Sequence, residues 1–289
     1  NDQPADKALY DITVSVPAPA QGIANGVLES TTTADGVTTN SWHLDEPAAS
    51  YLVTVATGDY TVEEDVSSSG VPLQYWAPTP QRRLIQGLRQ TADGLDWLEE
   101  KLGPYPFDSL GVLLVDSRSG METQTMITLG MTDYTTSGAV LVHEAAHQWY
   151  GDLVTPSDWR DVWMNEGMAM YLQANWSAEE DGQPLDATLD YWASIAPQLL
   201  RDGGPAAAYD PATFGTSNIY YVPALMWHEL RLRLGTDRFW SLVRAWPEEH
   251  AGQNADYDEI TTWWEEQTGL ELTAFFDSWL LGDTLPARA

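Results

Sequence analysis

The sequence lacks cysteine entirely and carries few basic residues. Without cysteine, the chain has no disulfides and no thiolate nucleophile or metal ligand, and its redox compartment stays open. No apolar run approaches the ~18 residues that a membrane-spanning helix needs. The first residues, Asn1–Lys7, lack the basic, apolar and small-residue regions of a signal peptide and look like the interior of a domain. These absences predict a chain without membrane spans whose chemistry depends on groups other than thiols.

Charge of one sign dominates the sequence. The 43 acidic residues outnumber the 13 basic ones, of which only Lys7 and Lys101 are lysines, and the formal net charge is −30. Such a field repels nucleic acid and anionic membranes, so we expect neither as a partner. It can favour a cationic substrate, but dispersed acidity more often keeps a protein soluble, as in salt-adapted organisms. We favour this second interpretation.

The chain does have enough apolar and aromatic material for a large core. It has 289 residues, 43% of them hydrophobic, with 14 Trp and 13 Tyr. This content predicts one or two well-packed domains and argues against a disordered chain. No internal repeat or low-complexity tract is visible.

The first 66 residues have a β pattern. Residues Tyr10–Val16 alternate between apolar and polar side chains, and Pro17 ends the run. Further runs follow at short spacing over Gly26–Ser30, Thr38–Leu44 and Tyr51–Ala56. Strands of this kind suit an antiparallel sheet or part of a sandwich. The small-residue segment Ser67–Pro72 marks the domain boundary that we predict.

Beyond this boundary the sequence predicts a mixed sheet followed by helices. Thr79-Pro80 is expected to start a helix, with Thr79 as its N-cap, and Gly103 is expected to end it. A buried strand is expected over Gly111–Asp116, and a second, more exposed strand over Met126–Leu129. The later part of the chain is mostly helical, with helices expected over Tyr191–Arg201, Ile219–Leu234, Arg238–Trp246, Asp258–Gln267 and Leu272–Leu280.

The most specific chemical signal is a pair of histidines four residues apart. On an α-helix, His143 and His147 lie on one face, so both imidazoles can reach a single point. Zinc binds such nitrogens at about 2.0–2.1 Å, and a catalytic zinc site uses three protein ligands with a fourth position open to water. Glu144 lies beside the first histidine, where its carboxylate can take a proton from that water. Glu166, separated from His147 by 18 residues, lies on the next helical segment, Trp159–Ala169, and can supply the third ligand.

An alternative is that the two histidines lie on the exposed face of an amphipathic helix. The flanking segments Ala139–Val142 and Trp149-Tyr150 are apolar, which predicts that this helix is buried. A buried glutamate needs a partner, so we favour the metal-binding interpretation.

These residues resemble the aminopeptidase N family of zinc metallopeptidases, the gluzincin aminopeptidases. The resemblance rests on the His-Glu-x-x-His motif, the 18-residue spacing and the Asn-Glu-Gly-x-Ala pattern at residues 165–169. The segments Trp149–Thr155 and Asp161–Gly167 also follow the pattern of the family. The resemblance covers nearly the whole chain and is strongest from about Gly103 to Gly235.

The resemblance implies an α+β fold in two domains. Residues 1–66 resemble the C-terminal half of the antiparallel β domain that precedes the catalytic domain in the family, and we expect the first half of that domain to be missing. Residues 67–289 resemble the thermolysin-like catalytic domain, in which a mixed sheet is followed by a mostly α-helical part.

By resemblance, His143, His147 and Glu166 bind one Zn²⁺ and Glu144 is the general base. Two neutral imidazoles and one carboxylate leave such a site with a net positive charge, which makes a bound water acidic near neutral pH. Glu144 would accept the proton of this water and pass it to the leaving amine.

The reaction creates an oxyanion that needs a second donor, and the family uses a tyrosine ahead of a Lys-Gly-Ala segment. The matching stretch here is Ile219–Ala224, in which Val222-Pro223 replaces Lys-Gly. Counting back from Ala224 selects Tyr220. Tyr221 stays open as an alternative, because two adjacent tyrosines often serve packing alone.

An aminopeptidase must also bind the free α-amine, and a carboxylate near the zinc is its natural partner. The family keeps this carboxylate in a Gly-Ala-Met-Glu-Asn strand, which matches Ser119–Thr123 when aligned on Met-Glu. Glu122 is therefore the candidate for amine binding, and its alternative is an exposed loop acid. Gly120 and Met121 are further substrate-binding positions that can offer edge-strand hydrogen bonds. In the family, a second amine-binding residue comes from the first half of the β domain.

Other polar residues, outside the motif, have less specific roles. His43, on a predicted strand, and His228, on a predicted helix, are expected to be structural. Asp161, five residues before Glu166, could orient a ligand imidazole, and the sequence leaves this role open.

The leading hypothesis is a zinc-dependent aminopeptidase that acts as a monomer on peptides with a free N-terminal amine. A zinc endopeptidase or another zinc hydrolase on the same scaffold is an alternative, because the motif specifies water activation and not substrate length. A metal-binding and peptide-binding protein with little turnover is another, because a fragment can lose activity. The sequence leaves the compartment unknown and is compatible with a secreted, soluble protein.

Overall fold

The computed structural model describes residues 3–213 and 216–288. Within these ranges the chain forms two compact units. The first is Asp6–Gln148, and the second is the chain from Trp149 onward together with Gln3–Ala5. Each unit is described by itself below. The boundary expected at residue 66 is a different division of the chain, and it stays a prediction.

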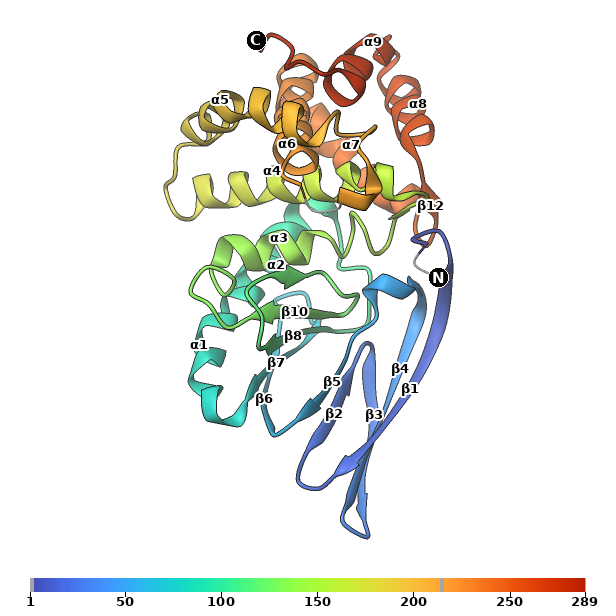
Figure 1. Ribbon diagram of the computed structural model, residues 1–289, viewed down its shortest axis with the longest axis vertical. Helices are drawn as coiled ribbons and strands as arrows, with labels where there is room; N and C mark the ends of the chain where they lie inside the picture. Colours follow the sequence, from blue (N-terminus) through green and yellow to red (C-terminus); the bar gives the residue numbers. More distant parts are fainter. Residues whose placement is uncertain (1–2, 214–215, 289) are drawn as a thin grey trace. The chain divides into compact units, whose positions relative to one another are not determined.

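The first unit begins with antiparallel strands, shown in blue in Figure 1. A three-stranded sheet has the order β1-β4-β3, and β2 pairs with β5. The bounds are Lys7–Pro17 for β1, Gln21–Ala24 for β2, Val27–Ala34 for β3, Val37–Ala49 for β4 and Val55–Gly58 for β5. The first three strands predicted in this region are confirmed. The strand predicted over Tyr51–Ala56 is wrong in its first half, where Ser50–Leu52 form a 3₁₀ turn, because the Leu52 carbonyl accepts hydrogen bonds from Asn25 and Gln124 instead of from a neighbouring strand.

A five-stranded mixed sheet follows, with the order β6-β7-β8-β10-β9. The bounds are Tyr60–Val66 for β6, Pro72–Pro78 for β7, Leu110–Val115 for β8, Gly120–Met121 for β9 and Met126–Gly130 for β10. The strands β7, β8 and β10 are parallel, and β6 and β9 are antiparallel edge strands. The buried strand predicted at Gly111–Asp116 is confirmed as β8. The segment 67–71 is the turn of the β6–β7 hairpin, in which Ser67 N donates to Val71 O at 3.0 Å.

Strand β10 is more buried than its sequence suggested. The strand exists where we predicted it, but four of its five residues are buried. The expectation of an exposed strand is wrong because β10 lies inside the sheet, between β8 and the short edge strand β9. Strand β9 is too short for a pattern of alternation to show, but the family resemblance implied an edge strand at this place, and β9 lies at the edge of the sheet.

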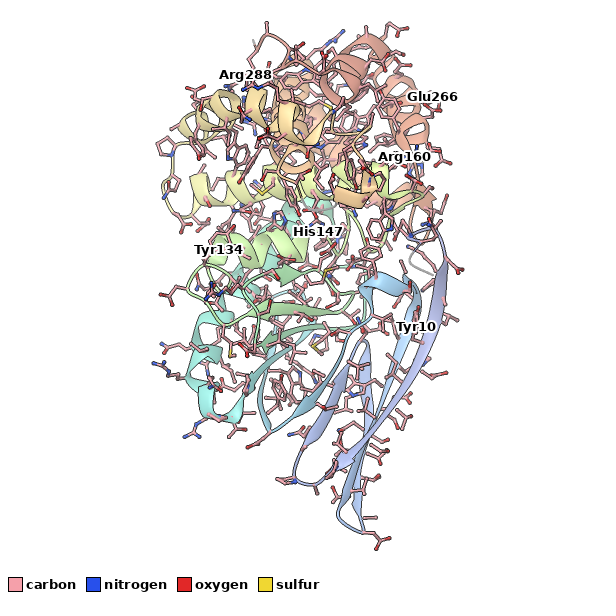
Figure 2. The ribbon with its side chains drawn as sticks, in the orientation of Figure 1. Tyr10, Tyr134, His147, Arg160, Glu266 and Arg288 are labelled. Carbon is pink, nitrogen blue, oxygen red and sulfur yellow. The ribbon has the colours of Figure 1, made fainter. Side chains whose placement is uncertain are left out.

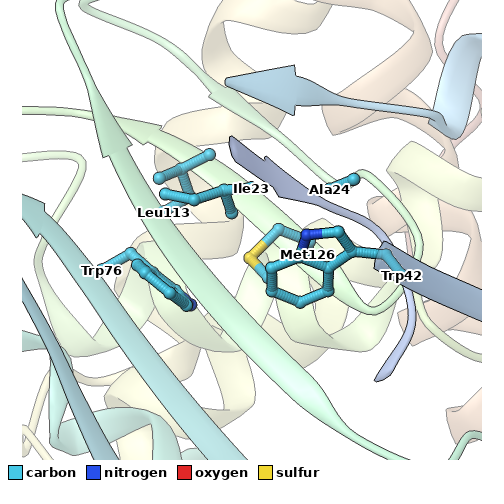
Figure 3. Packing of buried hydrophobic residues seen from close by; sticks show 6 residues of the cluster. All are labelled: Ile23, Ala24, Trp42, Trp76, Leu113 and Met126. Carbon is cyan, nitrogen blue, oxygen red and sulfur yellow. The ribbon is translucent and has the colours of Figure 1, made fainter. Parts of the chain in front are cut away.

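One hydrophobic core cluster joins the N-terminal strands to the five-stranded sheet (Figure 3). Its members are Ile23 and Ala24 of β2, Trp42 of β4, Trp76 of β7, Leu113 of β8 and Met126 of β10. The ring centroids of Trp42 and Trp76 are 6.1 Å apart. Because a tryptophan buries about 150–250 Å² of surface, this pair contributes strongly to holding the N-terminal strands against the sheet.

The helices of the first unit are α1 (Ile85–Leu88), α2 (Gln90–Leu102) and α3 (Gly138–Ala146). The helix predicted to start at Thr79 begins as a 3₁₀ segment, and Thr79 is not its N-cap. The Thr79 hydroxyl instead donates to Asp59 Oδ1 at 2.8 Å, because Asp59 lies just before the neighbouring strand β6. Gly103 ends α2 as predicted, with a φ of 92° that favours glycine.

The second unit is almost entirely helical (Figure 1). Its helices are α4 (Trp163–Glu179), α5 (Leu185–Gly203), α6 (Asn218–Leu234), α7 (Thr236–Glu249), α8 (Tyr257–Thr268) and α9 (Thr273–Phe276). Helix α6 lies against α4, α5 and α7 and is buried on most sides, as an apolar central helix must be. Two short strands, β11 (Thr155–Pro156) and β12 (Asn254–Ala255), pair in parallel. The last predicted helix is shorter than expected, because a π-helical turn over Asp277–Leu281 follows α9.

Antiparallel strands, a mixed sheet and then helices confirm the predicted α+β fold. Across the described residues, none of the helices combines the length and the apolar character that crossing a membrane requires.

Candidate metal centre

Helix α3 carries the histidine pair, and the local sequence explains how this helix is placed. Ser137 is its N-cap, and the Ser137 Oγ accepts a hydrogen bond from Val140 N at 3.4 Å. Leu141 and Val142 are buried. The helix packs closely on α2, since a Cβ added at Gly94 would lie 2.9 Å from Val142 Cγ2. The motif therefore lies on a rigid, buried element.

The imidazoles of His143 and His147 converge as the spacing predicts. Their Nε2 atoms are 3.2 Å apart, and their rings are nearly perpendicular, at 78°. Two nitrogen ligands 2.0–2.1 Å from a tetrahedral zinc ion lie about 3.3 Å apart, so this separation suits a pair that shares one ion. The two residues are 8% and 1% exposed, so the alternative of surface histidines is wrong. Figure 2 shows His147 at the end of α3.

Glu166 lies in the first turn of α4 and is buried. A Cβ added at the next residue, Gly167, would overlap Pro223 of α6, so glycine permits the close approach of these two helices. One ligand atom each from His143, His147 and Glu166 lie within 4.8 Å of one another. Among the described residues no other trio of histidine and acidic side chains gathers in this way. Two imidazoles and one carboxylate fit one Zn²⁺.

Glu144, which lies between the two histidines in the sequence, is buried. Its side chain lies against Gly120 of β9. A Cβ added at Gly120 would be 2.6 Å from Glu144 Cδ and closer still to Oε1. Strand β9 is held there by its pairing with β10, in which Met121 faces Thr128. The candidate base and the candidate substrate strand are therefore neighbours within one unit.

The structure places Glu122 in an irregular segment, residues 122–125, that follows β9. Glu122 is buried, so the alternative of an exposed loop acid is wrong. Gly120 and Met121 are half-buried on β9, which is the edge strand of its sheet. The three candidate substrate-binding positions thus lie in the same compact unit as the histidine pair.

Tyr220 and Tyr221 lie near the start of α6 and contact different neighbours. Tyr220 is half-buried against a small cluster that includes Val162 and Tyr209. The ring of Tyr221 has its centroid 5.1 Å from that of Trp192 in α5. Tyr221 therefore packs α6 against α5. This contact fits the packing role that the sequence analysis allowed for one of the two tyrosines.

Asp161 is buried just before α4. Its Oδ1 accepts a hydrogen bond from Tyr257 N at 3.2 Å. Burial, and after it the nearby carboxylate of Asp256, raise the pKa of Asp161 to about 7, against the lowering effect of the Tyr257 hydrogen bond. These contacts link Asp161 to the start of α8. Its suggested role in orienting a ligand imidazole stays a prediction.

The histidines outside the motif have local partners. His43 Nδ1 lies 2.7 Å from Asp11 Oδ1 across two paired strands. His228 Nδ1 lies 3.2 Å from the Tyr171 hydroxyl in a buried environment, and burial lowers the pKa of His228. Both arrangements fit the structural roles expected for these residues.

Sequence reasoning missed Gln148, which directly follows His147. Gln148 is 0% exposed and uses both ends of its amide in hydrogen bonds. The available signal was a strongly polar residue at the end of a helix predicted to be buried, next to the apolar pair Trp149-Tyr150.

A mixed sheet, a helix that bears His-Glu-x-x-His and a glutamate from the next helix are the features of a zinc metallopeptidase domain. The chain belongs to peptidase family M1, because the model of the peptidase family M1 domain matches residues 87–279. The family and the fold that we expected from the sequence are thus confirmed.

Known relatives agree with this assignment. Over 96% of its length the chain is 27% identical to a glutamyl aminopeptidase from Bitis rhinoceros and 27% identical to an aminopeptidase N from Streptomyces lividans. These matches cover 32% and 36% of the two relatives, so the chain spans about a third of the length of the curated relatives it matches. A crystal structure of an M1 zinc metallopeptidase mutant from Deinococcus radiodurans, bound to a Tyr-Ser-Ala substrate, is 27% identical with a TM-score of 0.82. It covers 99% of this chain and 66% of the other.

Proposed function

We propose that this chain is the catalytic part of a zinc aminopeptidase, which hydrolyses the first peptide bond of peptides with a free N-terminal amine. The observation that carries the proposal is the convergence of the ligand atoms of His143, His147 and Glu166, with the buried Glu144 beside the first of them. Membership of family M1 and the names of the two relatives support it.

In this proposal His143, His147 and Glu166 hold one Zn²⁺. When bound, the ion supplies a Lewis acid that acidifies water and polarises the scissile carbonyl. Glu144 accepts the proton of the attacking water and donates it to the leaving amine. The hydroxyl of Tyr220 donates a hydrogen bond to the oxyanion that develops on the substrate carbonyl.

In this proposal, Glu122 is the residue that restricts hydrolysis to the N-terminal peptide bond of a substrate. Its carboxylate forms a charge-assisted hydrogen bond with the protonated α-amine of the substrate. Because Glu122 and Glu144 belong to one compact unit, the amine is held at a set position relative to α3, and only the first peptide bond is within reach of the base. The edge strand β9, through Gly120 and Met121, offers main-chain hydrogen bonds to the substrate backbone.

The test compares a peptide that has a free amine with its N-acetylated twin, each before zinc removal by a chelator, after removal, and after zinc is restored. We expect zinc-dependent hydrolysis of the free-amine peptide and at least about a hundredfold lower rate on the acetylated one. Glu122→Ala should raise KM and lower kcat for the free-amine peptide. Glu64→Ala, on an exposed part of β6, is the control and should change neither.

Two outcomes would contradict the proposal. Equal rates on the two peptides, unchanged in Glu122→Ala, would indicate a zinc endopeptidase. Zinc-replete protein that binds peptides and hydrolyses neither of them would indicate a peptide-binding protein.

A further inference from the structure

The segment that carries Glu122 is irregular and yet fully enclosed. Residues 122–125 connect β9 to β10, and all four of them are buried. A buried backbone outside a helix or sheet needs other partners for its N–H and C=O groups, since each unsatisfied group is costly. The partners that this segment uses therefore show what determines its position.

Gln148 binds both ends of the segment from one side. Its Nε2 donates to Glu122 O at 3.2 Å, and its Oε1 accepts from Thr125 N at 2.9 Å. The hydroxyl of Tyr105 donates to the same Oε1 at 3.3 Å. Because Gln148 directly follows His147, this side chain is a direct connection between the end of the histidine helix and the main chain of Glu122.

Asn25, from the turn after β2, holds the middle of the segment from another side. Its Nδ2 donates to Gln124 O at 2.6 Å and to Leu52 O at 2.9 Å, and its Oδ1 accepts from Thr54 N at 2.7 Å. The next residue, Gly26, donates its N–H to Thr125 Oγ1 at 2.7 Å. The N-terminal strands and the histidine helix thus hold the same four residues.

Thr125 shows that the segment is held under strain. Its φ is 62°, in the left-handed region that a β-branched residue rarely adopts. It occupies the third position of a turn in which Met126 N donates to Thr123 O at 3.0 Å, a position usually filled by glycine. Such strain persists only where the surroundings over-determine the conformation, and here Gln148 and Gly26 bind the main chain and the hydroxyl of Thr125.

We propose that Gln148 is a positioning residue that sets the place of the Glu122 main chain relative to the histidine pair on α3, and thereby the selectivity for free N-terminal amines. The proposal rests on the amine-binding function proposed for Glu122. Glutamine suits this role because one flat amide both donates and accepts, and it spans the two ends of the segment at once. A glutamate at this position would keep the acceptor but would present an oxygen to Glu122 O, and a methionine would remove both hydrogen bonds.

The experiment uses the full chain with Gln148→Glu and Gln148→Met, and Asn40→Asp as a matched control. Asn40 is a buried amide of the same unit that accepts from Gly22 N and donates to Thr31 Oγ1, both at 2.9 Å, away from the segment. Zinc content, thermal stability and kinetics on the free-amine and acetylated peptides are measured for each variant. Hydrogen exchange of peptides spanning residues 120–128 gives a readout that does not depend on activity or on zinc.

In Gln148→Met we expect the Thr125 amide to exchange at least about tenfold faster, while the peptides of β8 stay protected. In both Gln148 variants the ratio of kcat/KM between the free-amine and acetylated peptides should fall at least about tenfold, mainly through KM, at unchanged zinc content. Asn40→Asp should lower thermal stability and leave both readouts at wild-type values.

Two results would overturn the proposal. One is wild-type exchange over residues 120–128 in Gln148→Met. The other is a parallel loss of activity on both peptides that follows thermal stability, as in the Asn40 control, which would make Gln148 a structural residue alone. A wild-type chain that shows no preference for free amines would refute the proposed function of Glu122 and the selectivity claimed here, and the exchange data would still decide whether Gln148 holds the segment.

Discussion

The carboxylate of Glu144 lies directly against the Cα of Gly120. A Cβ at this position would be 2.6 Å from Glu144 Cδ and 3.1 Å from Leu129 Cδ2. The backbone of Gly120 does not have a positive φ, so glycine is needed here for space and not for its conformational freedom. The edge strand β9 therefore forms one wall around the proposed general base and limits where its carboxylate can lie.

Gly120→Ala should push the Glu144 carboxylate away from its position. The end of a glutamate side chain can rotate at little cost, so we expect folding and zinc content to change little. Turnover should fall by about a hundredfold, because a displacement of about 1 Å is enough to misalign a proton transfer. Steady-state kinetics and elemental analysis measure both effects. Gly87→Ala is the control, since its Cβ would meet no atom closer than 3.9 Å, and full activity in Gly120→Ala would show that this contact is unimportant.

Glu144→Gln separates metal binding from proton transfer. The amide has the same shape as the carboxylate but cannot accept the proton of the attacking water, so turnover should fall by several orders of magnitude. Zinc should stay at about one equivalent, because its ligands are untouched. His147→Ala is the opposite case and should lose zinc. Near-normal turnover in Glu144→Gln would remove this residue from the role of base.

Tyr220→Phe should lower kcat with little effect on KM. The hydroxyl is proposed to act on the oxyanion, so its loss should cost roughly 2–4 kcal/mol of transition-state stabilisation. Tyr221→Phe keeps the ring that packs on Trp192 and should have activity close to wild type. If Tyr221→Phe causes the larger loss of kcat, Tyr221 and not Tyr220 is the oxyanion donor. The alignment with the family, in which Val222-Pro223 replaces Lys-Gly, is then wrong by one residue.

The parts of this site that could be predicted are those that depend on local geometry. The convergence of His143 and His147 follows from the pitch of an α-helix, and their burial follows from the apolar residues on either side of the motif. The alternation of Tyr10–Val16 similarly predicted β1, because the period of two along a strand is a local property, whereas its pairing with β4 joins residues 20 or more positions apart in the sequence.

The parts that could not be predicted depend on contacts between residues far apart in the sequence. The exposure expected for Met126–Leu129 was wrong because β10 is covered by strands whose order the sequence does not state. Thr79 has a capping sequence, but a nearby acceptor at Asp59 competes for its hydroxyl. The role of Gln148 depends on the segment 122–125, which has no regular pattern and is recognisable only when the chain is folded.

The stability of the chain should depend on the ionisation of Asp161. The folded state raises the pKa of this buried carboxyl from 3.8 to about 7, first through burial and then through repulsion by Asp256. Between about pH 4 and pH 7, the folded state therefore holds a proton that the unfolded chain has already released. Stability contributed by this group falls as the pH rises through that window, and the full penalty applies above pH 7.

Asp161→Asn removes this penalty and keeps an oxygen that can accept the hydrogen bond from Tyr257 N. We expect the variant to be more stable than wild type at pH 8, on the order of 2–4 kcal/mol, and the difference to vanish near pH 4. Thermal unfolding from pH 4 to pH 8 measures the trend. Asp158→Asn is the control, and its expected effect on stability has the opposite sign. Arg160 lowers the pKa of Asp158, so loss of the Asp158 carboxylate should destabilise the chain slightly at neutral pH. A stability difference between Asp161→Asn and wild type that does not change with pH would show that Asp161 stays ionised in the folded protein.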